Sequence, residues 1–443
     1  MKTTELAAAA AAHSVDVERW RVGFDEVLDR VASRFSRCET LRNAGALMLG
    51  LVSDLGRKNC WTLAERAGHP SPDRLQHLLA RAKWDADGVV ADLRGYLSEH
   101  LGDLDAVLVV DETGDVKKGS ATVGVQRQYS GTAGRIENSQ VAVYLAYAAG
   151  AGHTLIDRRL YLPKDWCEDP ERREAAGVPD DVEFATKPAL ATQMITAALD
   201  GGMPAGAVAG DEVYGADPEL RQTLQQRGIG YVLGIGANRA VTTGAGAERV
   251  DVLTASLPRR AWQRRSVGMG AKGQRWYSWA LIDITESDAD GAAAGQHHLL
   301  VGRNDKTGEL AYYRCYSPQP ATLADHVRVA GWRWKVEESF QTSKELAGLD
   351  EHQVRRWTSW HRWVTLAMLA HAFLVVTTAA QRYVDTAGTT LITLTVNEFR
   401  RLFDALLLRP LHAVADILAW STWRRKHQAI ARACHHRKHH QHQ

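Results

Sequence analysis

The sequence is poor in the residues that build disulfide frameworks and zinc sites. Its five cysteines are scattered along 443 residues and include no CxxC pair, so neither kind of site is predicted, and a reducing cytoplasm is expected. Long apolar runs are also missing: the run 364–376 has 13 residues, whereas a membrane span requires about 20. The Ala-rich N-terminus carries Lys2, Glu5 and His13, which makes it too polar for a secretory signal peptide.

A strong net charge is absent as well, because 54 basic residues nearly balance 52 acidic ones. The charge is unevenly placed, however. No acidic residue follows Asp416, whereas six basic residues do: Arg424, Arg425, Lys426, Arg432, Arg437 and Lys438. Such a tail is typical of a protein with a nucleic-acid partner, although a merely solvated tail has the same composition.

Two signatures of common enzymes are lacking. Gly268-Met-Gly-Ala-Lys-Gly273 has neither the spacing of a phosphate-binding P-loop nor a Ser or Thr after its lysine. No convincing Cys–His or Ser–His arrangement appears either, which favours a mechanism without a protein nucleophile.

A polar helix is predicted over residues 331–346, because neither Gly nor Pro occurs between positions 331 and 348. Arg333, Glu337 and Lys344 are spaced by four and seven residues and therefore share one face of this helix. A carboxylate flanked by two cations suits a site where a metal ion meets a phosphate. The alternative is a solvated helix face with i,i+4 ion pairs.

Acidic residues end two of the predicted strands. The apolar strand 105–111 ends at Asp111, and the short strand 206–210 is followed by Asp211. Strands 140–148 and 153–162 predict an antiparallel meander with the first strand, whereas the later alternation of helices 188–199 and 218–227 with strands 206–210 and 231–235 predicts a parallel part of one mixed sheet. Both acids would then lie at one edge of this sheet. Asp211 by itself is also explained as a turn residue.

The carboxylates of Asp111, Asp211 and Glu337 would repel one another if they converged without a counter-charge, and each would raise the pKa of the others. Divalent cations remove that penalty, and hard oxygen ligands select Mg²⁺ or Mn²⁺. A pair of such ions stabilises both the attacking and the leaving oxygen of a phosphoryl displacement. The three acids are therefore predicted to be catalytic and to hold two metal ions.

Basic residues predict DNA contacts in two further regions. Two short helices, 61–67 and 72–81, have a linker of helix-turn-helix length and carry Arg74 and Arg81; an ordinary helical hairpin is the alternative. The Gly-rich segment 237–322 is predicted to be a β-rich insertion in which cations are interleaved with tryptophans: Arg264, Arg265 and Lys272 with Trp262, Trp276 and Trp279. This mixture suits DNA grooves and unstacked bases, or alternatively a small β core with a solvated basic rim.

Three motifs occur in the order found in a known family. The helix keeps the Arg-to-Glu and Glu-to-Lys spacings of a Tyr-Arg-Glu-Lys signature, with Ala330 at the Tyr position and Trp332 or Trp334 as alternative aromatics. Leu108-Val-Val-Asp111-Glu-Thr-Gly114 is similar to the family's first catalytic stretch, and Ala209-Gly-Asp211-Glu-Val-Tyr214-Gly215 to its second. From about residue 40 to the tail, the chain therefore resembles the DDE transposases of bacterial insertion sequences.

The resemblance implies a mixed α/β fold, in which a ribonuclease H-like core carries a β-rich insertion and is flanked by helical regions. The implied segments are a helical DNA-binding region (1–104), the two parts of the core (105–236 and 323–383), the insertion (237–322) and a C-terminal helical region with the basic tail (384–443). The implied partners are double-stranded DNA, comprising terminal inverted repeats and target, and a second copy of the chain. The implied location is the bacterial nucleoid in the cytoplasm, with no membrane contact.

The resemblance also implies a reaction. Asp111, Asp211 and Glu337 would hold two Mg²⁺ or Mn²⁺ ions, and a 3′-hydroxyl generated by strand cleavage would attack target DNA. Glu338 is a rival for the third acid, but only Glu337 keeps the spacing to the DNA-binding Arg333 and Lys344. The further DNA contacts predicted are Lys117, Lys118, Arg74, Arg81, Arg264, Arg265, Lys272, Trp262, Trp276, Arg424 and Arg425. Some relatives flip a base onto a tryptophan of the insertion, for which Trp262, Trp276 and Trp279 are the candidates.

Two other functions remain as alternatives. The first is a captured transposase that only binds DNA, and the second is a metal-dependent nuclease or junction resolvase on the same core. Three intact acids favour the transposase over a pure binder, which gains nothing from mutually repelling carboxylates. The insertion, the N-terminal helices and the basic tail favour assembly on specific DNA ends over a resolvase.

Overall fold

The computed structural model describes residues 16–130, 134–270, 273–285, 295–385 and 394–408, together with residues 420, 422–423, 425–428 and 430. The chain divides into two compact units: Val90–Thr342 forms one, and Met1–Val89 with Ser343–Gln443 forms the other. Of the predicted DNA contacts, Lys272 and Arg424 lie outside the described residues. The five-segment division drawn from the sequence stays a prediction.

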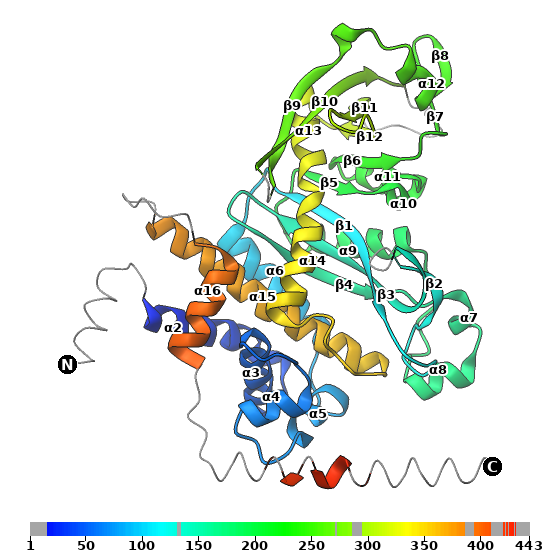
Figure 1. The fold of residues 1–443 in the computed structure, drawn as a ribbon. Coiled ribbons are helices and arrows are strands. Elements are labelled where there is room, and N and C mark those ends of the chain that lie inside the picture. The colour runs from blue at the N-terminus through cyan, green and yellow to red at the C-terminus, as the bar shows by residue number, and fades with distance from the viewer. Residues whose placement is uncertain are drawn as a thin grey trace. The chain divides into compact units, whose positions relative to one another are not determined.

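A mixed sheet forms the centre of the Val90–Thr342 unit (Figure 1). β1 (Val107–Val116), β3 (Arg135–Ala148) and β4 (His153–Leu160) pair antiparallel, whereas β5 (Ala207–Gly210) and β6 (Gly230–Ile235) run parallel to β1. The resulting order β4-β3-β1-β5-β6 confirms the predicted ribonuclease H-like core. An unpredicted strand, β2 (Gln126–Ser130), pairs with the first residues of β3.

Helices cover this core because its strands are apolar on both faces: every residue of β5 and β6 is buried. α9 (Lys187–Asp200), α10 (Glu212–Gly215) and α11 (Pro218–Gln226) pack against one another and against strands β3 to β6. Side chains of Thr186 and Asp217 cap α9 and α11 by accepting backbone N–H groups. The helices that precede them are α6 (Ala86–Leu101), α7 (Lys164–Cys167) and α8 (Pro170–Ala176).

The predicted insertion is β-rich, but most of its strands extend the core sheet instead of forming a sheet of their own. β12 (Leu310–Ser317) pairs antiparallel with β6, followed outward by β11 (Gln296–Asn304), β10 (Gly273–Asp283) and β9 (Gln263–Gly270). A separate hairpin of β7 (Ala240–Thr243) and β8 (Gly246–Arg249) leads through α12 (Val250–Ala255) and the turn η2 (Arg259–Ala261). Val241 and Val250 of this segment join an apolar cluster with Ile235, Leu299 and Tyr312.

The single helix predicted over 331–346 is interrupted. α13 (Leu323–Trp332) ends just before Arg333, and α14 (Trp334–Ala347) begins just after it. α13 packs on β9, β5 and β6. Gly331 permits this close approach, because a Cβ there would lie 2.7 Å from the carbonyl oxygen of Val267 on β9. Arg333 therefore occupies the joint between a helix packed on the sheet and the helix that carries Glu337.

The other unit is helical. Its elements are α2 (Val17–Val31), η1 (Ala32–Arg34), α3 (Cys38–Val52), α4 (Cys60–Arg66), α5 (Asp73–Ala80), α15 (Trp357–Asp385), α16 (Val396–Phe403) and the short π-helix η3 (Asp404–Leu408). α4 and α5 confirm the two predicted short helices, and Arg74 and Arg81 are exposed. Whether this pair binds DNA stays a prediction.

α15 is longer than the apolar run predicted from the sequence. Its residues Trp357–Tyr383 are long and apolar enough to cross a membrane by length and composition alone, with a mean hydropathy of 1.8. However, 83% of the 18-residue stretch that has this hydropathy is buried inside the protein. Trp360 and Trp363 are each only 1% exposed. A core helix of a water-soluble protein has these properties, so they are weak support for a membrane span.

Arg362 of α15 anchors the C-terminal end of α5. It is 8% exposed and donates hydrogen bonds to the carbonyl oxygens of Leu78, Ala82 and Trp84, at 3.3, 2.6 and 3.4 Å. We predict that Arg362→Met lowers the free energy of unfolding by about 2–4 kcal/mol, because buried carbonyl groups lose their donor. Urea unfolding of the variant measures this. Arg356→Met, at an exposed position, is the control, and equal unfolding midpoints for both variants would contradict the assignment.

A buried histidine pair connects α13 to β11. The Nε2 of His326 lies 3.1 Å from the Nδ1 of His298, whose Nε2 lies 3.4 Å from a carboxylate oxygen of Asp283. Burial, reinforced by the neighbouring His298, lowers the pKa of His326 to about 4. Burial also lowers the pKa of His298, although Asp283 opposes the shift.

Because both imidazoles are neutral in the folded chain, whereas an unfolded histidine titrates near pH 6.5, the unfolded state takes up more protons as the pH falls below that value. We predict that their contribution to stability is complete above about pH 6.5 and declines as the pH falls toward 4. Thermal melting of the wild type and of His326→Gln over this range measures it. The melting temperature of the variant should depend less steeply on pH, and parallel curves would refute the prediction.

Candidate active site

The register of the sheet brings two of the predicted acids to one edge. β1 and β5 pair in parallel through Val107 with Ala207, and on to Val109 with Ala209. Asp111 and Asp211 each follow two residues after the last pair, so both lie just beyond the same end of the β1–β5 ladder. The predicted end of the first strand at Asp111 is wrong, however, because β1 continues beside β3 to Val116 and Asp111 lies in its middle. The side chain of Asp211 also accepts the backbone N–H of Val213 at 2.9 Å and caps α10. Asp211 therefore does have the structural role that the alternative predicted for it, and this role leaves its carboxylate able to bind a metal ion as well.

Crowding of negative charge perturbs these acids. Burial, followed by repulsion from Asp211 and Glu112, raises the pKa of Asp111 to about 7. Burial and Glu112 likewise raise the pKa of Asp211. Strongly perturbed carboxyl groups are typical of functional sites, because a stable fold does not otherwise gather like charges away from water.

Arg333 links Asp111 to the third predicted acid. Its Nη1 lies 3.9 Å from an oxygen of Asp111, and its Nη2 lies 3.7 Å from an oxygen of Glu337. The contact with Glu337 is an i,i+4 ion pair, as the alternative of a solvated helix face predicts. The contact with Asp111, however, shows that this helix face is turned toward the acid cluster. Burial raises the pKa of Glu337, and Arg333 opposes that shift.

Glu338, the rival third acid, has a different environment. Its carboxylate accepts from Lys335 at 2.8 Å and lies 3.3 Å from the Nε2 of His153 and 4.0 Å from Arg275. The hydrogen bond to His153 is the largest of the effects that lower the pKa of Glu338 to about 2. Lys335, Arg275 and His153 therefore engage Glu338 in structural contacts, which leaves Glu337 as the better candidate.

The structure does contain a serine–histidine contact, which the sequence analysis did not find. The Nδ1 of His153 lies 2.8 Å from the Oγ of Ser339. Ser339 is fully buried, however, and donates its hydroxyl proton to the carbonyl oxygen of Lys335 at 2.8 Å. This hydroxyl is therefore committed to the helix and is not a nucleophile. His153 instead fastens the start of β4 to α14.

The donor atoms of these acids are of the type that a divalent metal ion prefers. Carboxylate oxygens are the donors that Mg²⁺ and Mn²⁺ prefer, and a divalent cation would relieve the repulsion that raises the pKa of Asp111. Among the residues that the structure describes, no three His, Cys, Asp or Glu side chains are gathered closely enough to hold an ion as they are placed. The guanidinium of Arg333 supplies a positive charge at this place.

The predicted DNA contacts have unequal environments. Lys118, Arg265 and Arg425 are exposed. Lys117 lies 3.6 Å from a carboxylate oxygen of Asp115, and its side chain is 15% exposed. Lys344 is half-buried on α14, two helical turns beyond Glu337. Their contact with DNA stays a prediction.

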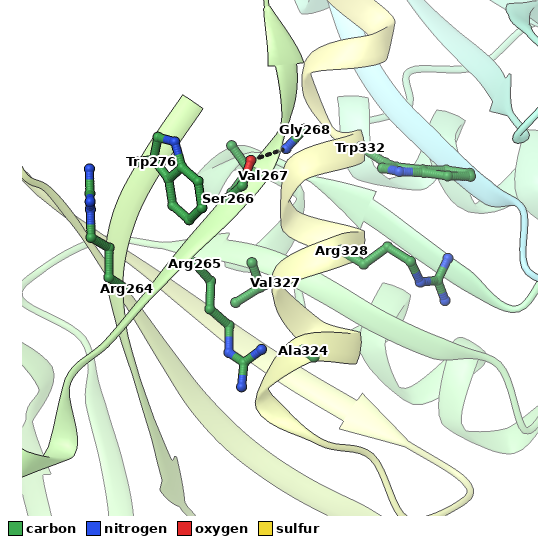
Figure 2. A pocket seen from close by; sticks show the side chains of 10 residues that line it. All are labelled: Arg264, Arg265, Ser266, Val267, Gly268, Trp276, Ala324, Val327, Arg328 and Trp332. Atoms are coloured by element: carbon green, nitrogen blue, oxygen red, sulfur yellow. Dashed lines mark hydrogen bonds between the residues drawn. The ribbon is translucent and has the colours of Figure 1, made fainter. Parts of the chain in front are cut away.

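A hollow of about 470 Å³ opens between the β9–β10 hairpin and α13 (Figure 2). Three arginines and two tryptophans contribute to its lining: Arg264, Arg265, Arg328, Trp276 and Trp332. Trp276 is 45% exposed, and the guanidinium of Arg264 lies 5.0 Å from its ring centre. Of the other candidates for base stacking, Trp279 is 3% exposed and Trp262 packs against the apolar cluster of the insertion. Trp276 is therefore the most accessible of the three indoles.

Comparison with known proteins bears on these motifs. The model of a family described as DDE superfamily endonuclease matches residues 30–267, a range that includes Asp111 and Asp211 and ends before Glu337. The probable transposase for insertion sequence element IS701 of Microchaete diplosiphon is 29% identical over 219 residues, which are 49% of this chain and 54% of the relative. The chain therefore covers about half the length of that relative. A piggyBac transposase synaptic complex with hairpin DNA, determined by cryo-EM, aligns with 89% of this chain and 80% of its own, at 12% identity and a TM-score of 0.44.

Proposed function

Because the chain belongs to the DDE superfamily of endonucleases, we propose that it is a DNA transposase that cuts at insertion-sequence ends and joins the resulting 3′-hydroxyl to target DNA. The observation that carries the proposal is the position of Arg333, which contacts both Asp111 and Glu337. Asp211 is close enough to raise the pKa of Asp111. Acids from three distant motifs are thus gathered around one cation. The similarity to the IS701 transposase supports the same activity.

Asp111 presents a carboxylate from the middle of β1, Asp211 presents one from the residue that follows β5, and Glu337 presents one from the first turn of α14. In our proposal these three residues hold two Mg²⁺ or Mn²⁺ ions. When bound, such ions stabilise charge on the attacking and leaving oxygens of a phosphoryl displacement and lower the pKa of bound water. The chain then needs no nucleophile of its own, which agrees with the buried and committed hydroxyl of Ser339.

Arg333 has a second role in this proposal. Its planar guanidinium pairs with two carboxylates in the present structure, and the same geometry suits a phosphate group. Lys344 follows on the same face of α14. Together they would hold the DNA backbone beside the acids, with two copies of the chain acting as a homodimer on paired DNA ends.

We predict that Asp211→Ala lowers Mg²⁺-dependent strand cleavage by about a thousandfold or more, because a lost ligand removes several kcal/mol of transition-state stabilisation. Binding to insertion-sequence ends should remain largely intact. Glu337→Gln should behave in the same way, whereas Glu338→Gln, the matched control, should cause a smaller loss. Gel analysis of end-labelled DNA measures cleavage, and a mobility-shift assay measures binding.

Cleavage that survives Asp211→Ala would show that the assignment of this acid is wrong. If the wild-type chain binds the ends but never cuts them, the captured DNA-binding protein becomes the better description. Equal losses of cleavage in Glu337→Gln and Glu338→Gln would contradict the assignment of Glu337 as a metal ligand and of Glu338 as a structural residue.

For the hollow in Figure 2, we propose that Trp276 stacks on an unpaired base while Arg264 and Arg265 hold the adjoining phosphates. Trp276→Ala should then weaken binding to end DNA with an unpaired base by about tenfold or more, because stacking contributes roughly 1–3 kcal/mol per base. Trp276→Phe keeps an aromatic face and should restore most of the affinity. Fluorescence anisotropy with matched paired and unpaired probes measures both. Equal losses on the two probes would refute stacking.

A further inference from the structure

The backbone pairing that aligns Asp111 with Asp211 stops before it reaches either residue. The last pair of the β1–β5 ladder is Val109 with Ala209. Beyond that point β1 continues beside β3 as far as Val116, whereas the chain after β5 turns into α10. Hydrogen bonds between strands therefore do not fix the separation of the two acids. Side chains have to do so.

Glu112, the residue after Asp111, forms the connection that the ladder lacks. One of its carboxylate oxygens accepts a hydrogen bond from the hydroxyl of Tyr214 at 2.6 Å. The other lies 2.6 Å from the ammonium nitrogen of Lys187. Tyr214 belongs to α10, whose N-cap is Asp211, so this carboxylate joins the segments of both acids.

Tyr214 has no alternative position available. Its side chain is fully buried, and a buried hydroxyl without a partner is costly. The helix that carries it is pressed against β6, because a Cβ at Gly215 would lie 1.8 Å from the carbonyl oxygen of Gly234. A shift of the tyrosine would therefore move α10 together with the Asp211 cap.

Lys187 supports the same conclusion from the opposite side of the carboxylate. It is the first residue of α9, where a cation opposes the helix dipole, and no acidic residue occupies that first turn. Glu112 supplies the missing negative charge. The pairing also neutralises Glu112 beside two other acids, which limits the repulsion that would push Asp111 and Asp211 apart.

We propose that Glu112 is a positioning residue, which uses its bonds to Tyr214 and Lys187 to hold Asp211 at a fixed distance from Asp111. The inference rests on the proposed function in that it takes these two aspartates to be metal ligands. We assign Glu112 to positioning and not to metal binding, because each of its oxygens already has a protein donor, Tyr214 or Lys187. Mutation of a residue that holds metal ligands in place without binding the metal typically lowers metal affinity or activity by about 10–100-fold.

The test measures Mn²⁺ binding to the full-length chain by electron paramagnetic resonance, together with end cleavage and the melting temperature. Tyr214→Phe removes only the hydroxyl and should weaken Mn²⁺ binding by about tenfold or more. Glu112→Ala should weaken it at least as much, whereas Glu112→Gln, which keeps an acceptor for Tyr214, should recover part of the affinity. Tyr231→Phe is the matched control: it removes another buried hydroxyl, bonded to Gln225 at 2.9 Å.

Three outcomes would overturn the inference. If Tyr214→Phe loses no more Mn²⁺ affinity than Tyr231→Phe, the hydroxyl is merely structural. If Tyr214→Phe binds Mn²⁺ more tightly than the wild type, Glu112 is itself a ligand. If Asp111→Asn binds Mn²⁺ as tightly as the wild type does, the metal site of the proposed function is wrong, and the inference fails with it. The first two leave the proposed function intact, which separates the two failures.

Discussion

The charge balance at the place where β1 and β5 cease to pair is the constraint on which the site depends. Asp111, Glu112 and Asp211 place three carboxylates in one partly buried region, where burial and then their mutual repulsion raise the pKa of both aspartates. Arg333, between α13 and α14, and Lys187, at the start of α9, oppose this repulsion. Each of these cations is also a mechanical link, because it fixes the helix from which it comes. The same two cations therefore both offset the repulsion between the acids and hold the surrounding elements in place.

The sheet provides the rigid frame for that balance. Extension of the core through β12 to β9 removes the exposed edge that β6 would otherwise have. It also supplies the surface on which α13 packs. The close contact of Gly331 with Val267 fixes the end of α13, and Arg333 follows directly afterwards, between α13 and α14. The insertion thus positions the helix joint that delivers Arg333 and Glu337, in addition to carrying the arginine- and tryptophan-lined hollow.

Glu337 and Glu338 illustrate how strongly position decides the role of a residue. They are neighbours on one helix, so their side chains point in directions about 100° apart. Glu338 is directed toward His153, Lys335 and Arg275 and becomes a deeply stabilised carboxylate. Glu337 contacts Arg333 beside Asp111 and has a raised pKa. The contacts of Glu338 hold α14 and leave Glu337 beside Arg333 and Asp111.

The sequence alone was sufficient for the order of core strands and for the prediction that Asp111 and Asp211 lie on neighbouring strands. It placed the end of the first strand at Asp111, which is wrong because pairing with β3 continues to Val116. The choice of Glu337 by its spacing to Arg333 and Lys344 stays a prediction. Strand order follows from the local alternation of apolar runs and helices, and spacing on a helix follows from its period, so both are local properties. Tertiary structure decided the remainder. The break at Arg333, the sheet extension and the bonds of Glu112 to Lys187 and Tyr214 depend on contacts between residues 75 or more positions apart or on packing against another element. Such contacts have no local pattern, because what determines them is which surfaces meet once the chain has folded.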